Sequence, residues 1–340
     1  MSERPFVVIG ENIHCTRIFK VGGKYCRTDD AGAAAIHYTG TSGAAALPVP
    51  EIFTAGADWA AGKVKHCAVA IWQGNYGATD ADRAAGTAYI QAAAREQAAN
   101  GAHFLDVNVD EFSTDIDERV RLMDWTVRTV QAAVALPVSV DSSNTAILDA
   151  GLAAVDRSHG RPMVNSASLD RRDAMTVAHR HDAVLILSAA GENDMPSGVE
   201  DRMANLARIL AEAEATGYTH ADLYLDPLVF PIATDGQNGV RFLDTVKAIR
   251  ETYGETIHVA AGLSNVSFGM PSRKLINQVF SRLARDLGAD GGIVDPIQIN
   301  GAILDGLDTD SKAFALTRAL LTGEDDFGMD FITAARAGEL

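Results

Sequence analysis

Eight short runs of apolar, often β-branched residues recur along this chain and constrain its fold more than any other feature. They cover residues 6–13, 103–110, 137–143, 162–168, 183–189, 222–228, 258–264 and 291–296. Runs this apolar are typical of parallel strands that are buried on both faces. Helical patterns follow most of the later runs, and strands alternating with helices predict βα units. Eight such units predict an α/β protein closed into a (βα)₈ TIM barrel.

Composition narrows the class of protein further. A chain of 340 residues with 47% hydrophobic content suits one barrel domain over residues 1–340. Its net charge of −16 argues against a nucleic-acid partner, because phosphate binding needs a basic surface. Three cysteines without a CxxC pair favour a reducing compartment. The start lacks an apolar signal segment, and no apolar run is long enough to span a membrane, so a cytoplasmic protein is expected.

Polar residues gather where the predicted strands end. They are Asp106, Asn108, Asp141, Asn165, Asp226, Asn265 and Asp295. Turn or N-cap chemistry explains any one of them equally well. In this fold, however, the carboxyl ends of the strands carry the active site, so the set as a whole predicts one. Carboxylates and amides suit a 2-amino-4-oxo pterin, a sugar or a divalent metal, and the residue types alone leave these three open.

A long segment between the first strand and a helix at residues 80–99 is unusual for a βα connection. We expect residues 14–80 to form an insertion within the barrel domain that serves as a lid or a docking element. It holds Cys15, Cys26 and Cys67, but their spacing fits no standard zinc site, so no metal is expected. Turns are predicted at residues 38–40 and 74–77 within it.

Several common catalytic motifs are missing from the chain. It contains no GxSxG elbow, no P-loop and no HExxH, and no GxGxxG follows the first strand. A hydrolase with paired carboxylates remains open on this evidence.

Seven short motifs, in order along the chain, resemble one family. They are GENI at 10–13, LDVNV at 105–109, VSVDSSN at 138–144, VNS at 164–166, LDPL at 225–228, GLSNVS at 262–267 and LIN at 275–277. The family is the methyltetrahydrofolate–corrinoid protein methyltransferases, which are similar to the folate-binding module of cobalamin-dependent methionine synthase. The resemblance implies a pterin-binding TIM barrel whose substrate is tetrahydrofolate or 5-methyltetrahydrofolate. It also implies a corrinoid on a partner protein, and a homodimer.

Roles follow from this resemblance, residue by residue. It assigns the catalytic residues as Asn265, beside the methyl-bearing N5, and Asp141, which also holds the pterin together with Asn165 and Asp226. The other substrate-binding residues that it implies are Glu11, Asp106, Asn108, Ser264, Phe268 and Arg273. Arg273 would meet the anionic glutamate tail of folate, although a solvated helix start explains it equally well.

The chain also departs from the family pattern. Asn12 stands where the family has arginine, His14 where it has asparagine, and Asp110 and Glu111 follow LDVNV in place of glycine. A dihydropteroate synthase-like pterin enzyme is the alternative, since Ser272 to Lys274 read like its SRK motif. A pterin-binding protein without turnover and a barrel with an unrelated ligand are further alternatives. The direction of methyl transfer, the upstream methyl donor and the corrinoid partner stay open.

Overall fold

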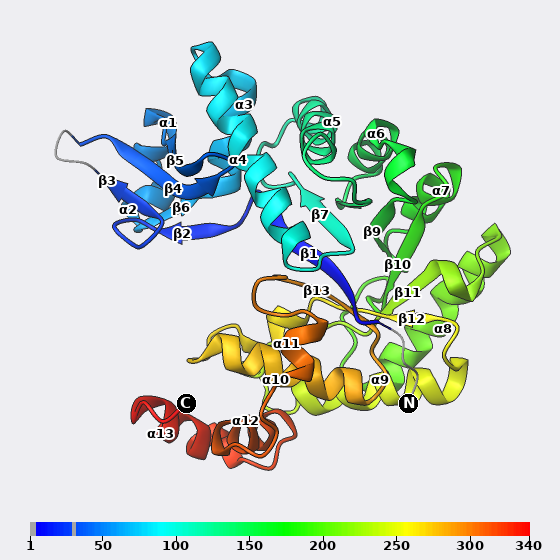
Figure 1. Cartoon of the computed structure of the whole chain (residues 1–340). Coiled ribbons are helices and arrows are strands. Elements are labelled where there is room, and N and C mark those ends of the chain that lie inside the picture. The colour runs from blue at the N-terminus through cyan, green and yellow to red at the C-terminus, as the bar shows by residue number, and fades with distance from the viewer. Residues whose placement is uncertain (1–4, 29–31) are drawn as a thin grey trace. The chain divides into compact units, whose positions relative to one another are not determined.

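The computed structural model describes residues 5–28 and 32–340 and contains an eight-stranded parallel sheet (Figure 1). Its strands are β1 (Val7–His14), β7 (Phe104–Asn108), β8 (Val138–Asp141), β9 (Met163–Ala167), β10 (Val184–Ser188), β11 (Leu223–Asp226), β12 (His258–Val259) and β13 (Gly291–Val294). The sheet order is β12-β11-β10-β9-β8-β7-β1-β13. Its two ends meet where the Ile293 N–H donates to the Ala261 carbonyl oxygen at 2.9 Å. All eight predicted strands are therefore confirmed, as is the TIM barrel.

The chain divides into two compact units, which we describe separately. The first unit comprises the described residues of Met1–Gly10, Asn100–His103 and Met163–Leu340. The second unit comprises those of Glu11–Ala99 and Phe104–Pro162.

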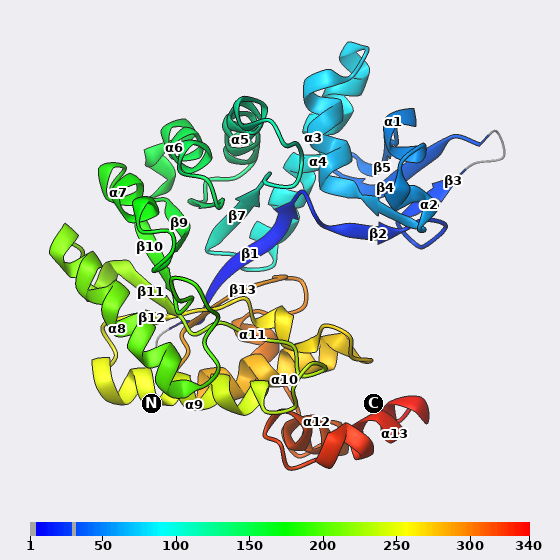
Figure 2. The same ribbon diagram turned by 180° about the vertical axis from the view of Figure 1, so that it is seen from behind.

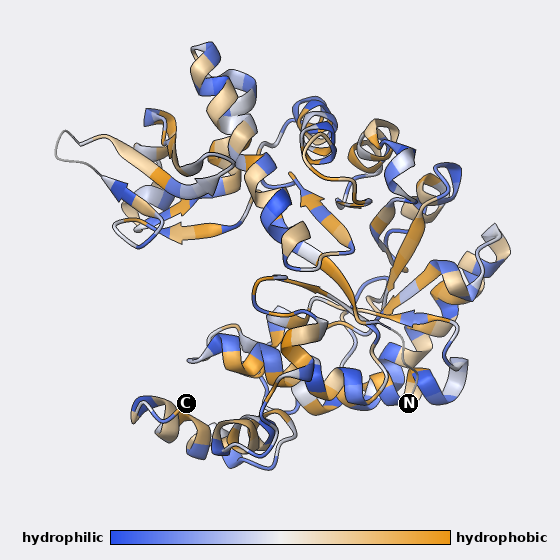
Figure 3. Ribbon diagram, in the orientation of Figure 1, coloured by the Kyte–Doolittle hydropathy of each residue, from blue (hydrophilic) through white to orange (hydrophobic). Residues whose placement is uncertain are grey.

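The first unit carries β9 to β13 and the helices that follow them. These helices are α7 (Asp173–Arg180), α8 (Val199–Thr216), α9 (Asn238–Tyr253), α10 (Arg273–Asp286), α11 (Gly301–Asp305), α12 (Lys312–Leu321) and α13 (Met329–Arg336). Every residue of β10 is buried, and Figure 3 shows this strand as hydrophobic while the helices carry both colours. A parallel strand covered on both faces needs this apolar composition. The register pairs Ser188 with Asp226, so the polar end of β11 lies beside that of β10.

The second unit carries β7 and β8 with α4 (Asp80–Ala99), α5 (Ile116–Gln131) and α6 (Thr145–Ala154). Between β1 and α4 the chain builds an antiparallel pair and a three-stranded antiparallel sheet. The elements are β2 (Ile18–Lys20), β6 (Lys63–Lys65), β3 (Cys26–Thr28), β4 (Ala34–Gly40), β5 (Gly43–Pro48), α1 (Glu51–Thr54), α2 (Ala57–Ala60) and α3 (His66–Tyr76). Figures 1 and 2 show them grouped beside α4.

The turn predicted at residues 74–77 is wrong, because Gly74 to Tyr76 form the last turn of α3. Gly74 of α3 and Gly86 of α4 instead allow these two helices to pack closely. A Cβ on Gly86 of α4 would collide with the backbone nitrogen of Gly74, and a Cβ on Gly74 would collide with the ring of Trp125. The turn predicted at residues 38–40 is also displaced, since Gly40 still pairs with Gly43 in the hairpin.

No helix in the described part of the chain combines the length and the apolar character that crossing a membrane requires.

Candidate functional site

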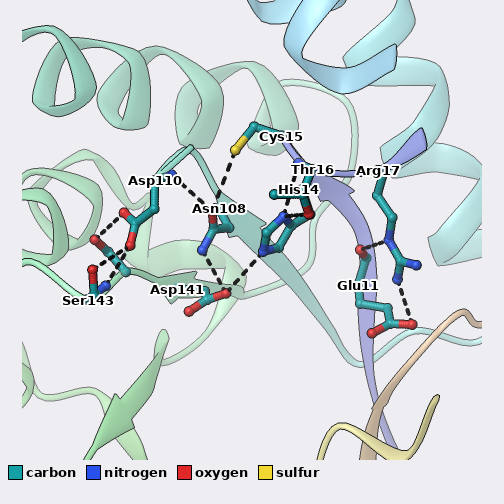
Figure 4. Close-up of polar contacts among 10 residues, drawn as sticks. Glu11, His14, Cys15, Thr16, Arg17, Asn108, Asp110, Asp141 and Ser143 are labelled. Carbon is teal, nitrogen blue, oxygen red and sulfur yellow. Dashed lines mark hydrogen bonds and ion pairs between the residues drawn. The ribbon is translucent and has the colours of Figure 1, made fainter. Parts of the chain in front are cut away.

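In the second unit, Asn108 and Asp141 end the neighbouring strands β7 and β8 and are paired in register. The Asn108 Nδ2 donates to Asp141 Oδ2 at 2.9 Å (Figure 4). The Asn108 Oδ1 in turn accepts from the Asp110 N–H at 2.9 Å, which fixes which way the amide faces. Asp141 therefore has one engaged oxygen, and no hydrogen bond to its Oδ1 is found within the described residues.

His14, at the end of β1, adds a second polar group beside Asp141. Its Nε2 lies 3.6 Å from Asp141 Oδ2, and both side chains are about one quarter exposed, at 26% and 23%. The backbone N–H of Thr16 lies 3.3 Å from His14 Nδ1, which makes this nitrogen the acceptor. A neutral imidazole then carries its proton on Nε2 and directs it towards Asp141.

Asp110 ties down the turn that follows Asp141. Its carboxylate accepts from the Ser142 hydroxyl at 2.6 Å and from the N–H and hydroxyl of Ser143, each at 2.8 Å. Asn144 then caps α6 by accepting from the N–H groups of Ala146 and Ile147. The DSSN segment thus holds the strand end in one conformation, and Figure 4 shows Asp110 facing Ser143.

Two other predicted residues of this unit are engaged within the protein. The Glu11 carboxylate pairs with Arg17 at 2.5 Å, and Arg17 also donates to the Glu11 carbonyl oxygen at 3.0 Å (Figure 4). Asp106 lies in β7 and is only 2% exposed.

In the first unit, Asp226 ends β11 and has different surroundings. The Leu228 N–H donates to Asp226 Oδ1 at 2.7 Å, and Leu228 adopts a left-handed backbone with φ of +65°. This conformation is costly for leucine and is typical of functional sites. Although the residue is only half-buried by surface area, burial of its carboxyl raises the pKa of Asp226 to about 7. The Leu228 N–H and the charge of Arg202 oppose that rise.

Asn265 lies in the same unit, on the short helix η3 (Leu263–Ser267) that follows β12. Its side-chain amide has no hydrogen-bond partner among the residues that the structure describes. A Cβ on Gly262 would lie 2.9 Å from Asn265 Nδ2, so the glycine leaves room for the amide.

Three further predicted residues surround this turn. Arg273 donates to the Ser264 carbonyl oxygen at 3.3 Å and to the Ser267 hydroxyl at 3.0 Å. Its guanidinium also lies over the ring of Phe268, 4.5 Å from the centroid. Because the ring of Phe268 is 48% exposed, Phe268 and Arg273 form the outer wall of this turn.

The remaining residues that were predicted at strand ends have different positions and partners. Asn165 lies in the middle of β9 and is half-buried. Asp295 accepts from the Ile297 N–H at 3.0 Å and from Gln298 Nε2 at 2.5 Å, so it stabilises its own turn. Sequence reasoning missed Arg202 of α8, which is fully buried and donates to the Pro227 carbonyl oxygen at 2.7 Å. Nothing in the sequence distinguishes it from an exposed arginine.

Within residues 5–28 and 32–340, no three His, Cys, Asp or Glu side chains come together in a way that could hold a metal ion.

Comparison with known proteins identifies the family. A model of the "Pterin binding enzyme" family matches residues 80–295, more than half of the chain. The methylcorrinoid:tetrahydrofolate methyltransferase of Eubacterium limosum is 29% identical over 62% of this chain and 76% of its own length. The methionine synthase of Mycobacterium tuberculosis is 28% identical over 61% of this chain, which spans only 18% of that protein.

The fold has solved counterparts as well. The dihydropteroate synthase of Xanthomonas albilineans, in complex with 7,8-dihydropteroate, superposes with a TM-score of 0.52 at 19% identity. The match covers 72% of this chain and 87% of that one. Together with the family match, these findings show that the chain belongs to the pterin binding enzymes.

Proposed function

We propose that this enzyme moves a methyl group between N5 of (methyl)tetrahydrofolate and a corrinoid carried by a partner protein. The observation that carries the proposal is Asn265, whose amide is held on η3 beside Gly262 and makes no hydrogen bond within the described part of the chain. The names of the two relatives support it, since one is a methylcorrinoid:tetrahydrofolate methyltransferase and the other a methionine synthase.

The carboxylates and amides fit a pterin by their chemistry. The pyrimidine edge of a pterin offers an amino group beside a ring N–H, which together match the two oxygens of one carboxylate. Asp226 presents such a carboxylate, and in the structure the Leu228 N–H is the donor to its Oδ1. We assign pterin contacts to Asp226, Asn165, Ser264 and Asn265 in the first unit, with Phe268 and Arg273 nearer the folate tail. In the second unit we assign them to Asp141, Asn108, Asp106 and Glu11.

Asn265 would act at the reacting nitrogen. Loss of the methyl group leaves negative charge at N5 unless a proton reaches it, so a hydrogen bond that strengthens in the transition state lowers the barrier. An amide can donate or accept, and the same side chain therefore serves both directions of transfer. The corrinoid would supply the cobalt centre that accepts or donates the methyl group.

We also propose that residues 14–80 dock or cover the corrinoid partner. Three large apolar side chains there are exposed: Ile18 (46%), Tyr25 (44%) and Ile52 (63%). Point substitutions test this better than deletion of the segment, because α3 packs against α4 and its residues 66–71 are buried. Ile18→Ser with Tyr25→Ser should leave the reaction with free cobalamin unchanged and slow the reaction with the cognate corrinoid protein. Equal rates with that protein would contradict docking.

The central test is an anaerobic assay of methyl transfer. Purified enzyme is mixed with methyltetrahydrofolate and Co(I) cobalamin, and the visible spectrum reports the conversion to methylcobalamin. We expect Asn265→Ala to lower kcat by about 100-fold, the typical cost of losing a donor aimed at developing charge. Asn75→Ala is the matched control, since the Asn75 amide donates to the Ile71 carbonyl oxygen within α3.

The outcomes of this assay separate the alternatives. Pterin binding without transfer to cobalamin or to the corrinoid protein would leave a binding protein or a dihydropteroate synthase-like enzyme. Absence of pterin binding would refute the proposed function altogether.

A further inference from the structure

Arg202, on the first turn of α8, is a buried cation whose hydrogen-bonding capacity is largely unused. The residue is 0% exposed. Its Nε donates to the Pro227 carbonyl oxygen at 2.7 Å, but neither Nη1 nor Nη2 has a hydrogen-bond partner within the described residues. Burying a guanidinium in this way is costly, and an apolar side chain of similar volume is often better for stability. A role in stability therefore explains Arg202 poorly.

The charges around Arg202 identify the carboxylate on which it acts. Burial lowers the pKa of Arg202, as does Arg241 of α9, whereas Asp226 and Asp201 raise it. Asp201 already accepts from the N–H and the hydroxyl of Ser197, at 3.0 and 2.5 Å. Asp226 directly precedes Pro227, the residue that Arg202 holds, and it is the buried carboxylate of this group.

We propose that Arg202 is a positioning residue for Asp226. It fixes the turn from Asp226 to Leu228 through the Pro227 carbonyl, and it supplies the positive charge that keeps the carboxylate ionised when the pterin edge binds. The inference rests on the proposed function, because that function assigns Asp226 to the pterin.

Two features of the turn from Asp226 to Leu228 explain why it needs the Arg202 guanidinium. Leu228 has a left-handed backbone, which is costly for leucine, and its N–H donates to Asp226 Oδ1 at 2.7 Å. An ionised carboxylate offers acceptors to both donors of a pterin edge, whereas a protonated one has turned one oxygen into a donor. Folate binding therefore requires Asp226 to be deprotonated.

This requirement gives a sign to the effect of pH. Because the pKa of Asp226 is raised to about 7, folate affinity should fall as the pH drops through that value. Arg202 opposes the rise, so removing its charge moves the midpoint to higher pH. We expect a shift of about one pH unit in Arg202→Met, which corresponds to about fivefold weaker binding at pH 7, where the wild-type carboxyl is half ionised.

Calorimetry with methyltetrahydrofolate between pH 6 and pH 9 tests this directly. The variants are Arg202→Met, Arg202→Lys and the control Arg208→Met, which removes an arginine of the same helix that is 53% exposed and paired with Glu192. Lysine keeps the charge but not the geometry at Pro227, so Arg202→Lys should bind a few-fold more weakly with an unchanged midpoint. The Arg208→Met control should match wild type.

The results separate failure of the proposed function from failure of the role of Arg202. Failure of the wild-type protein to bind methyltetrahydrofolate refutes the proposed function. Binding by the wild type with the same pH midpoint in Arg202→Met refutes only the role of Arg202. If Arg202→Met does not fold, as judged by circular dichroism, the neutral Arg202→Gln carries the same prediction. A midpoint that shifts equally in Arg202→Lys would refute the role of the charge.

Discussion

Asp141 at the end of β8 and Asp226 at the end of β11 are both strand-end carboxylates, but different groups surround them. Asp141 is 23% exposed, and side-chain nitrogens of Asn108 and His14 face its Oδ2 at 2.9 and 3.6 Å. Asp226 receives one backbone N–H, and burial raises its pKa to about 7. Within one sheet, therefore, one carboxylate is contacted by neighbouring polar side chains, whereas the other is buried with one backbone donor and the charge of Arg202 near it.

Burial costs Asp226 more than Asp141, so the two carboxylates should contribute differently to ligand binding. A hydrogen bond from a ligand to a buried carboxylate contributes more binding free energy, because the local dielectric is low and the unbound carboxylate is poorly solvated.

Replacing each carboxylate by its amide should separate the two in affinity. We expect Asp226→Asn to weaken methyltetrahydrofolate binding by about 100-fold or more, and Asp141→Asn by roughly tenfold, since a charge-assisted hydrogen bond in a buried site is worth more than one near solvent. Titration calorimetry at pH 8 measures both dissociation constants. Equal losses would show that the two surroundings do not matter for the ligand.

Asp226 should also make the stability of the folded protein depend on pH. The folded-state pKa of Asp226 is raised from 3.8 to about 7, so the folded protein binds this proton more tightly and loses stability as the pH rises between these values. Asp226→Asn should therefore be more stable than wild type at pH 8, by about 1–3 kcal/mol, and similar to it at pH 4.

Urea unfolding at both pH values checks this prediction. Asp141→Asn serves as the control, because the Asp141 side chain is 23% exposed and accepts from Asn108, so its replacement relieves no comparable burial. A destabilised Asp226→Asn at pH 8 would mean that the loss of its attraction to Arg202 outweighs the relief of burying one charge fewer.

Loosening the turn beside Asp141 tests whether its polar surroundings position it. Asp110→Ala removes the acceptor of three hydrogen bonds from Ser142 and Ser143. We expect about 1–3 kcal/mol of lost stability and a five- to tenfold rise in the dissociation constant of folate. Asp124→Ala, on the exposed face of α5, is a control because its partner Arg128 is largely exposed. Unchanged affinity in Asp110→Ala would show that Asp141 needs no support from this turn.

The smallest effect should come from His14. His14→Asn restores the residue type of the family motif and removes one group facing Asp141 at 3.6 Å. We expect a change in folate affinity of about threefold or less, because Asn108 still donates to the same oxygen. A loss as large as that of Asp141→Asn would make His14 a principal determinant of binding in this chain.

The contrast also shows which parts of the molecule the sequence predicts. The apolar runs predict all eight strands, because a strand buried on both faces has little freedom in composition. The resemblance predicts Asn108, Asp141, Asp226 and Asn265 as site residues, and the structure places each of them at or just beyond a strand end.

Other features depend on long-range packing, which local patterns do not encode. Gly74 reads as a turn residue, yet it lies in the last turn of α3, where this helix packs closely against Gly86 of α4. Arg202 follows Glu200 and Asp201 at a helix start and reads as exposed, yet it is fully buried. Only the fold determines which charged residue of that turn faces inward.

The cysteines of the second unit, Cys15, Cys26 and Cys67, are free, and all are 0% exposed. Burial raises the pKa of Cys15 and of Cys67 to about 12, so neither thiol is a nucleophile that competes for a transferable methyl group. An alkylating reagent can reach them only when the surrounding structure opens. The labelling rate of each thiol therefore measures how often its own surroundings unfold: after β1 for Cys15, in β3 for Cys26 and in α3 for Cys67. Equal rates would show that these three places unfold together, and unequal rates that they unfold separately.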